Sequence, residues 1–129
     1  MVSPIVQAVG YRNNWGVDTI DTTSVLDREQ LRAITMDDED LMREIVAALI
    51  DDTSNQIQLL REAIRDRDAA HCKRLAHYSK GACANVGANS AATLLKQIEK
   101  TASAGEFPEC GLALENLARQ IELLRGEVI

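Results

Sequence analysis

Aromatic residues are scarce in this chain of 129 residues, which holds one Trp, two Tyr and one Phe. Its core must therefore be aliphatic, a composition that favours packed helices over a β-sandwich. Glycine and proline are few beyond residue 16, and no alternation of period two indicates strands. No segment approaches the roughly 20 apolar residues that span a bilayer. Residues 1–16 also lack a charged start and an apolar run, so we expect neither membrane insertion nor a signal peptide.

Positive charge is in the minority, and the net charge is −6. Nucleic acid is therefore an unsuitable partner, since it requires a basic surface. The charge is unevenly distributed: residues 37–52 hold seven acidic residues and one basic, whereas residues 69–88 hold Lys73, Arg74, Lys80 and no acidic residue. A basic island in an acidic protein indicates a site for an anion or an acidic partner.

Motifs for cofactors and metals are missing. Cys72, Cys83 and Cys110 are odd in number and have no C-x-x-C spacing, so we interpret them as buried free thiols in a reducing, cytoplasmic compartment. His71 and His77 are six residues apart and diverge on a helix, which argues against a zinc site. A glycine-rich phosphate loop is absent as well. The sequence therefore predicts no metal, no cofactor, no ATP binding and no kinase activity of its own.

Helical spacing of apolar residues predicts an all-α fold, an antiparallel up-down four-helix bundle with a short additional N-terminal helix. We expect helices from Ser24 to Ile34, from Asp37 or Asp38 to about Arg65, from Asp68 to Gly87, from Asn89 or Ser90 to Gly105, and a last one with Pro108 in its first turn. The predicted N-caps of the first, third and fourth helices are Ser24, Asp68, and Asn89 or Ser90. Residues 24–129 would form this one domain. Residues 1–23 would be an irregular tail or linker that docks, if at all, through Trp15 or Ile20.

The same spacing predicts which faces turn inward. On the long helix these residues are Leu41, Ile45, Leu49, Thr53, Ile57, Leu60 and Ile64; on the fourth they are Leu94, Leu95, Ile98 and Ala102; on the fifth they are Leu114, Leu117, Ile121, Leu124 and Val128.

The predicted third helix displays a lone histidine. At about 100° per residue, His77 lies opposite the buried face, which consists of Cys72, Leu75, Ser79, Ala82, Cys83 and Val86. Around His77 lie Lys73, Arg74, Gly81, Ala84 and Ala88, which we expect to form a surface for partner docking. Gly81 costs about 1 kcal/mol relative to alanine inside a helix, and close approach by a partner would explain it. From helix geometry alone, an ordinary surface histidine is an equal alternative.

The motif His77-x-x-Lys80-Gly81, followed by Val86-Gly87-Ala88, resembles the signature of the histidine-containing phosphotransfer (HPt) domain family. Other parts of the chain match the family in character: Asp27 to Leu31 in the first helix, the acidic turn Asp66-Arg67-Asp68, and Leu95 to Glu99 in the fourth helix. The resemblance extends from Val25 to the C-terminus. Tyr78 and Ser79 depart from the usual pair after the histidine, which affects local packing rather than the phosphoacceptor.

The resemblance implies that His77 accepts a phosphoryl group, that Lys80 stabilises its charge, and that Glu99 orients the imidazole ring. Glu99 is ten residues past Asn89 and His77 is ten before Gly87, so both should lie at the same level of antiparallel helices. The donor and acceptor would be receiver domains of a response regulator or hybrid sensor kinase, which supply Mg²⁺. We expect a monomeric phosphorelay intermediate. The alternative is a non-catalytic helical adaptor that binds a signalling partner through the same face.

Overall fold

The structure is a computed structural model that describes residues 24–127, and within this range it contains five helices and no strand. The helices are α1 (Arg28–Thr35), α2 (Glu39–Arg65), α3 (Ala69–Val86), α4 (Asn89–Ser103) and α5 (Phe107–Arg125). The predicted all-α bundle with a short N-terminal helix is confirmed. Residues 1–23, with the proposed docking residues Trp15 and Ile20, and Val128 lie outside the described range. The domain division at residue 24 therefore stays a prediction.

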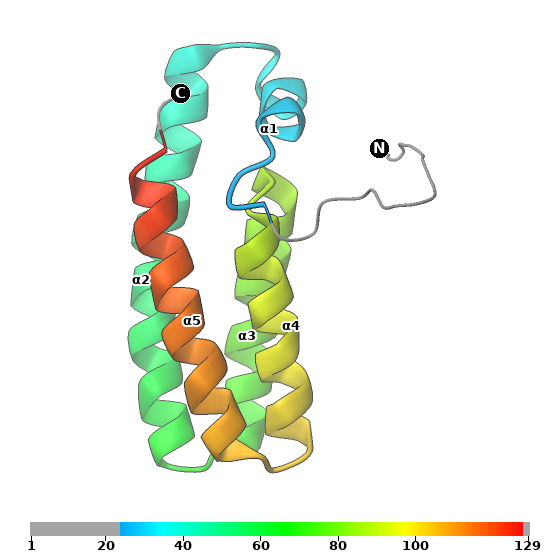
Figure 1. The fold of residues 1–129 in the computed structure, drawn as a ribbon, viewed down its shortest axis with the longest axis vertical. Helices are drawn as coiled ribbons and strands as arrows, with labels where there is room; N and C mark the ends of the chain where they lie inside the picture. The colour runs from blue at the N-terminus through cyan, green and yellow to red at the C-terminus, as the bar shows by residue number, and fades with distance from the viewer. Residues whose placement is uncertain (1–23, 128–129) are drawn as a thin grey trace, which may run out of the picture.

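Helices α2 to α5 run antiparallel along the long axis of the molecule (Figure 1). Helix α2 has 27 residues and α3 has 18, which at 1.5 Å per residue gives lengths of about 40 Å and about 27 Å. Helix α2 therefore extends past its neighbours at one end. Helix α1 packs beside this extension, in contact with α2 and α3, and closes that end of the bundle (Figure 1).

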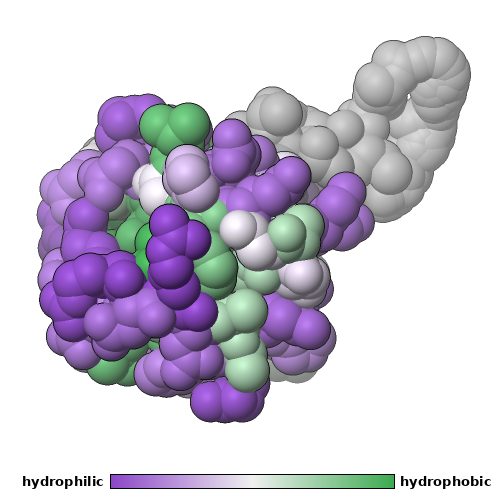
Figure 2. All heavy atoms as spheres, turned by 90° about the horizontal axis from the view of Figure 1, so that it is seen from below, coloured by the Kyte–Doolittle hydropathy of each residue, from purple (hydrophilic) through white to green (hydrophobic). Residues whose placement is uncertain are grey.

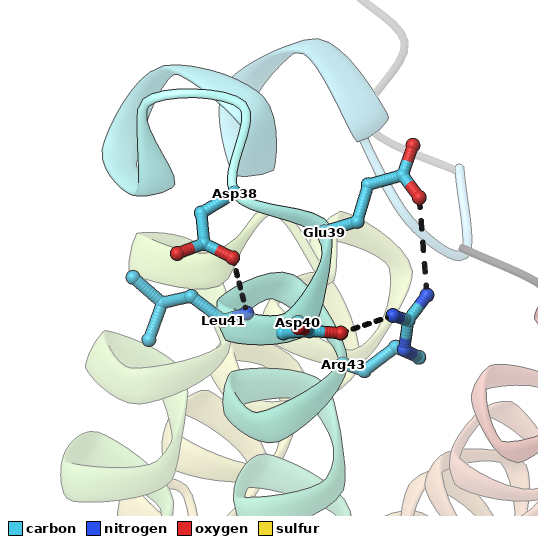
Figure 3. Close-up of polar contacts among 5 residues, drawn as sticks. All are labelled: Asp38, Glu39, Asp40, Leu41 and Arg43. Atoms are coloured by element: carbon cyan, nitrogen blue, oxygen red, sulfur yellow. Dashed lines mark hydrogen bonds and ion pairs between the residues drawn. The ribbon is translucent and has the colours of Figure 1, made fainter.

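Helix ends follow local chemistry at most positions. At the start of α2, the Asp38 carboxylate accepts a hydrogen bond from the Leu41 N–H, and Arg43 pairs with Glu39 and Asp40 (Figure 3). Acidic residues at this end also favour the positive pole of the helix dipole. Asp68 caps α3 in the same way, as predicted.

Two further helix ends, that of α3 and the start of α5, carry residues with special backbone preferences. Gly87 ends α3 with φ 96°, in the left-handed conformation that glycine adopts without steric cost. Pro108 lies in the first turn of α5, as predicted.

Two predicted caps and one predicted core residue are wrong. Asp27, not Ser24, caps α1, and α4 starts at Asn89 after Ala88 without any side-chain cap. Leu41 is 37% exposed. The buried stripe at this end of α2 runs through Met42, Val46 and Ile50 instead, because the extension of α2 packs against α1 as well as α5.

The core is aliphatic along its whole length. Its largest fully buried side chains include Leu31, Leu60, Leu95, Ile98, Leu114, Leu117, Ile121 and Leu124. Figure 2 views the end opposite α1 and shows mainly hydrophilic residues, with hydrophobic ones between them and at a few places on the rim. The aliphatic layer inside the bundle therefore holds the helix carrying His77 at a fixed height and rotation.

The three cysteines are buried free thiols, as the sequence predicted. Burial raises the pKa of Cys72 and of Cys83 to about 11, with the nearby Cys110 and Asp68 adding to the effect at Cys72. Both thiols therefore stay protonated and unreactive at neutral pH. Among the described residues, no Cα of α3 comes within 8 Å of one in α5. A disulfide between Cys72 and Cys110 would need closer Cα atoms.

Candidate functional site

His77 lies on the exposed side of α3, with 72% of its side chain accessible. The neighbouring positions Ala76 and Ser79 are both buried, at 0% and 1% exposure. Because these two residues point into the bundle, packing fixes the rotation of α3, and His77 must face outward. The sequence prediction of an outward-facing histidine is therefore confirmed.

Glu99 on α4 joins His77 to Lys80. Its Oε2 atom lies 3.1 Å from His77 Nδ1, and its Oε1 atom accepts a hydrogen bond of 2.6 Å from Lys80 Nζ. One carboxylate thus uses one oxygen for each partner. No described residue hydrogen-bonds His77 Nε2, so this nitrogen faces solvent on the open side of the ring.

The short connection between α3 and α4 aligns these residues. Gly87 and Ala88 alone separate the two helices, and the Ala88 N–H donates to the Cys83 carbonyl. The Asp27 N–H donates to the carbonyl of Gly87 at 2.8 Å and ties the start of α1 to this turn. The turn therefore fixes the register that brings Glu99 level with His77, as the spacing predicted.

Electrostatics keep Glu99 ionised. Partial burial by itself would raise the pKa of Glu99, but the hydrogen bonds from Lys80 and His77 outweigh it and lower the pKa below its ordinary value. The Glu99 side chain is 22% exposed and that of Lys80 is 30% exposed, against 72% for His77. The ion pair is therefore partly shielded from solvent, while the ring above it is open.

The surface around His77 carries two cations and two small residues. Lys73, Arg74, Gly81 and Ala84 are exposed on α3. A Cβ atom added at Gly81 would meet no atom within 4 Å, so nothing in residues 24–127 requires a glycine there.

Ala88 was a wrong prediction as an exposed docking residue, since it is 0% exposed. The chain turns at Gly87, so the angular period of α3 no longer applies one residue later.

Two neighbours of the site were not found from the sequence. Tyr78 is 57% exposed beside His77, and the negative charge of Asp52 on α2 raises its pKa. Gln30 on α1 donates from Nε2 to the carbonyl oxygen of Ala84 at 2.6 Å, which gives this carbonyl in the last turn of α3 a hydrogen-bond partner. Both contacts join helices whose relative placement no local spacing reveals.

Residues 24–127 contain no cluster of His, Cys, Asp and Glu suited to a metal ion. In the same range, no helix is both long and apolar enough to cross a membrane.

Comparisons with known proteins agree with this geometry. The family model of the Hpt domain matches residues 44–127. A crystal structure of histidine-containing phosphotransfer protein B from Pseudomonas aeruginosa PAO1 is similar, with a TM-score of 0.72 and 26% sequence identity. The similarity covers 78% of this chain and 88% of that one. A search of curated protein sequences finds no match.

Proposed function

The chain belongs to the Hpt domain family and is a histidine phosphotransfer protein of phosphorelay signalling, and we propose that His77 is its phosphoacceptor. One observation supports this assignment above the others: an exposed imidazole whose Nδ1 is held by Glu99 while Nε2 faces solvent. A neutral ring with the proton on Nδ1 has its lone pair on Nε2, the atom that attacks phosphorus.

In the proposed reaction, Nε2 attacks the phosphorus of an aspartyl phosphate on a receiver domain. The new N–P bond forms as the P–O bond to the aspartate breaks, and the electron pair leaves with the aspartate carboxylate. Transfer onward to a second receiver is the same step in reverse. Since the receiver supplies the acidic pocket and Mg²⁺, this chain needs only a nucleophile, a cation and a docking surface.

Lys80 is the proposed cation for the phosphoryl group. It lies one helical turn from His77 and is held on the same side of α3 by Glu99. Charge on the transferring group spreads over its oxygens during the reaction, and an ammonium nearby stabilises that charge. Lys80→Ala should therefore slow transfer while leaving the bundle folded, since its side chain lies at the surface.

The proposed docking surface consists of Lys73, Arg74, Gly81 and Ala84. Two cations complement the acidic pocket of a receiver. The two small residues leave room for its backbone. We further propose that the chain is a monomeric cytoplasmic carrier without ATP-dependent kinase activity, because the phosphoryl group comes from the receiver.

The decisive experiment incubates the chain with phosphorylated receiver domains and measures intact mass. Wild type should gain one phosphoryl group that is labile in acid and stable in base, as expected of a phosphoramidate. His77→Gln should gain none, although its fold is unchanged by circular dichroism. Label that persists in His77→Gln, or that survives acid, would refute the assignment. A His77→Gln chain that keeps full signalling activity would instead favour the adaptor alternative.

A further inference from the structure

The two oxygens of Glu99 serve different partners. Oε2 lies 3.1 Å from the ring nitrogen Nδ1 of His77, and Oε1 accepts the 2.6 Å hydrogen bond from Lys80. Lys80 therefore has two anions to neutralise once His77 is phosphorylated: the carboxylate on one side and the phosphoryl oxygens on the other. If Lys80 served only the phosphoryl group, its hydrogen bond to Glu99 would have no role.

The proton on His77 Nδ1, which Glu99 holds, decides how readily the ring releases a phosphoryl group. When Nε2 bonds to phosphorus and Nδ1 keeps its proton, the ring becomes a cation. When the N–P bond later breaks, the phosphoryl group passes to a receiver carboxylate or to water, the electron pair returns to Nε2 and the ring leaves as neutral imidazole, so the ring itself neither gains nor loses a proton. Without the Nδ1 proton the ring would leave as an anion, which is a far poorer leaving group. The protonated phosphohistidine is thus the transferable form.

We propose that the Lys80–Glu99 ion pair sets the lifetime of the phosphoryl group on His77. Glu99 holds the Nδ1 proton that makes the ring a good leaving group, and Lys80 weakens that hold by neutralising part of the carboxylate charge. The inference rests on the proposed assignment of His77 and adds a regulatory role at the same site. Lys80 acts here as a positioning residue, through Glu99.

Few other charged groups face the ring. Lys73 and Arg74 precede it by one turn of α3, and Glu99 is the charged residue of α4 in contact with it. On α2, the charge of Asp52 acts on Tyr78. Lys100 is next to Glu99 in the chain but lines a separate hollow with Thr93 and Ala104. Lys100 therefore offers a matched control, a lysine of α4 that does not share the carboxylate.

The inference predicts opposite effects for the two members of the pair. Glu99→Gln removes the charge that retains the Nδ1 proton. The phosphorylated ring should therefore lose this proton, and hold the phosphoryl group longer, from a lower pH than in wild type. Lys80→Met removes the cation that pairs with the Glu99 carboxylate, so the protonated, transferable form should persist to a higher pH than in wild type. Each change should alter the lifetime near neutral pH by about tenfold, the scale of one charge-assisted hydrogen bond.

The test phosphorylates the purified chain with potassium phosphoramidate, which donates a phosphoryl group without any protein partner. Loss of the group is followed by intact mass and phosphorus NMR between pH 5 and pH 9, for wild type, Glu99→Gln, Lys80→Met, the double variant and Lys100→Met. The midpoint of the pH–rate profile should fall in Glu99→Gln and rise in Lys80→Met. Lys100→Met should match wild type.

The double variant decides the inference. If Lys80 acts through Glu99, Lys80→Met should shift the midpoint much less in the Glu99→Gln background than in wild type. Equal shifts in both backgrounds would overturn the inference, since Lys80 would then act on the phosphoryl group or the ring directly. That outcome leaves the proposed function intact. Label on a residue other than His77 would overturn both.

Discussion

Gly81 allows docking to be separated from folding. It lies in the interior of α3, well away from both ends of Ala69–Val86, and a Cβ atom placed there would meet nothing within 4 Å. Gly81→Ala should therefore gain the full difference in helix propensity, about 1 kcal/mol of unfolding free energy. For a domain of this size that gain corresponds to an increase in Tm of about 4 °C.

Urea denaturation and thermal melting measure this gain directly. Gly111 on α5 is a matched control, because a Cβ added there also meets nothing within 4 Å. Gly111→Ala should stabilise the bundle by a similar amount. If neither variant is more stable than wild type, the propensity argument fails. If only Gly111→Ala is more stable, the fold requires glycine at position 81 for a reason other than the space around it.

Function is tested with a larger side chain at the same two positions. Gly81→Gln should reduce both affinity for a receiver domain and the rate of phosphoryl transfer, because its side chain projects from the proposed docking surface. Gly111→Gln should leave both unchanged, since no described Cα of α5 lies within 8 Å of one in α3. Titration calorimetry gives the affinities, and intact mass gives the rates. Undiminished affinity in Gly81→Gln would mean that the receiver does not cover this surface.

Three further substitutions test the fold around the site. Gly87→Ala should destabilise by about 1–3 kcal/mol, because the residue has φ 96° and its Cβ would lie 2.8 Å from the Asp27 carbonyl oxygen; urea denaturation measures it. Ser79→Ala should stabilise by about 1 kcal/mol, because the buried Ser79 hydroxyl has no hydrogen-bond partner among the described residues; an equal or lower urea midpoint would contradict this. Glu99 has a lowered pKa, so its contribution is present above its ordinary value of 4.5 and is lost as the pH falls through the folded value; Glu99→Gln should accordingly narrow the stability difference between pH 7 and pH 3.

Features determined by neighbouring residues were predictable from the sequence. Helix α3 begins after Asp68 and ends at Gly87. Both ends were predictable, because a capping carboxylate and a residue free to adopt positive φ act within one turn. The level of Glu99 beside His77 was also predictable, since a connection this short permits only one antiparallel register.

Features determined by distant partners were not predictable. The exposed Leu41 and the buried Met42 reflect the packing of α1 against the extension of α2. Asn89 or Ser90 was expected to cap α4 by residue preference, but long-range backbone bonds organise this turn instead. The Ser90 N–H donates to the Ser24 carbonyl. Gly87 in turn accepts from Asp27. Residue preference cannot reveal bonds between segments so far apart in the chain.

The α3–α4 turn is therefore part of the site, although none of its residues touches the imidazole. Each residue added to a helix rotates it by about 100° and advances it by about 1.5 Å. One extra residue in the turn would direct Glu99 away from α3 unless the helix shifted back against its core contacts, Leu95 and Ile98. Gly87 prevents such slippage by two constraints, its left-handed backbone and the close approach of Asp27. The chemistry at His77 thus depends on a backbone conformation ten residues along the chain, which couples the folding of α1 onto α3 to the placement of the carboxylate.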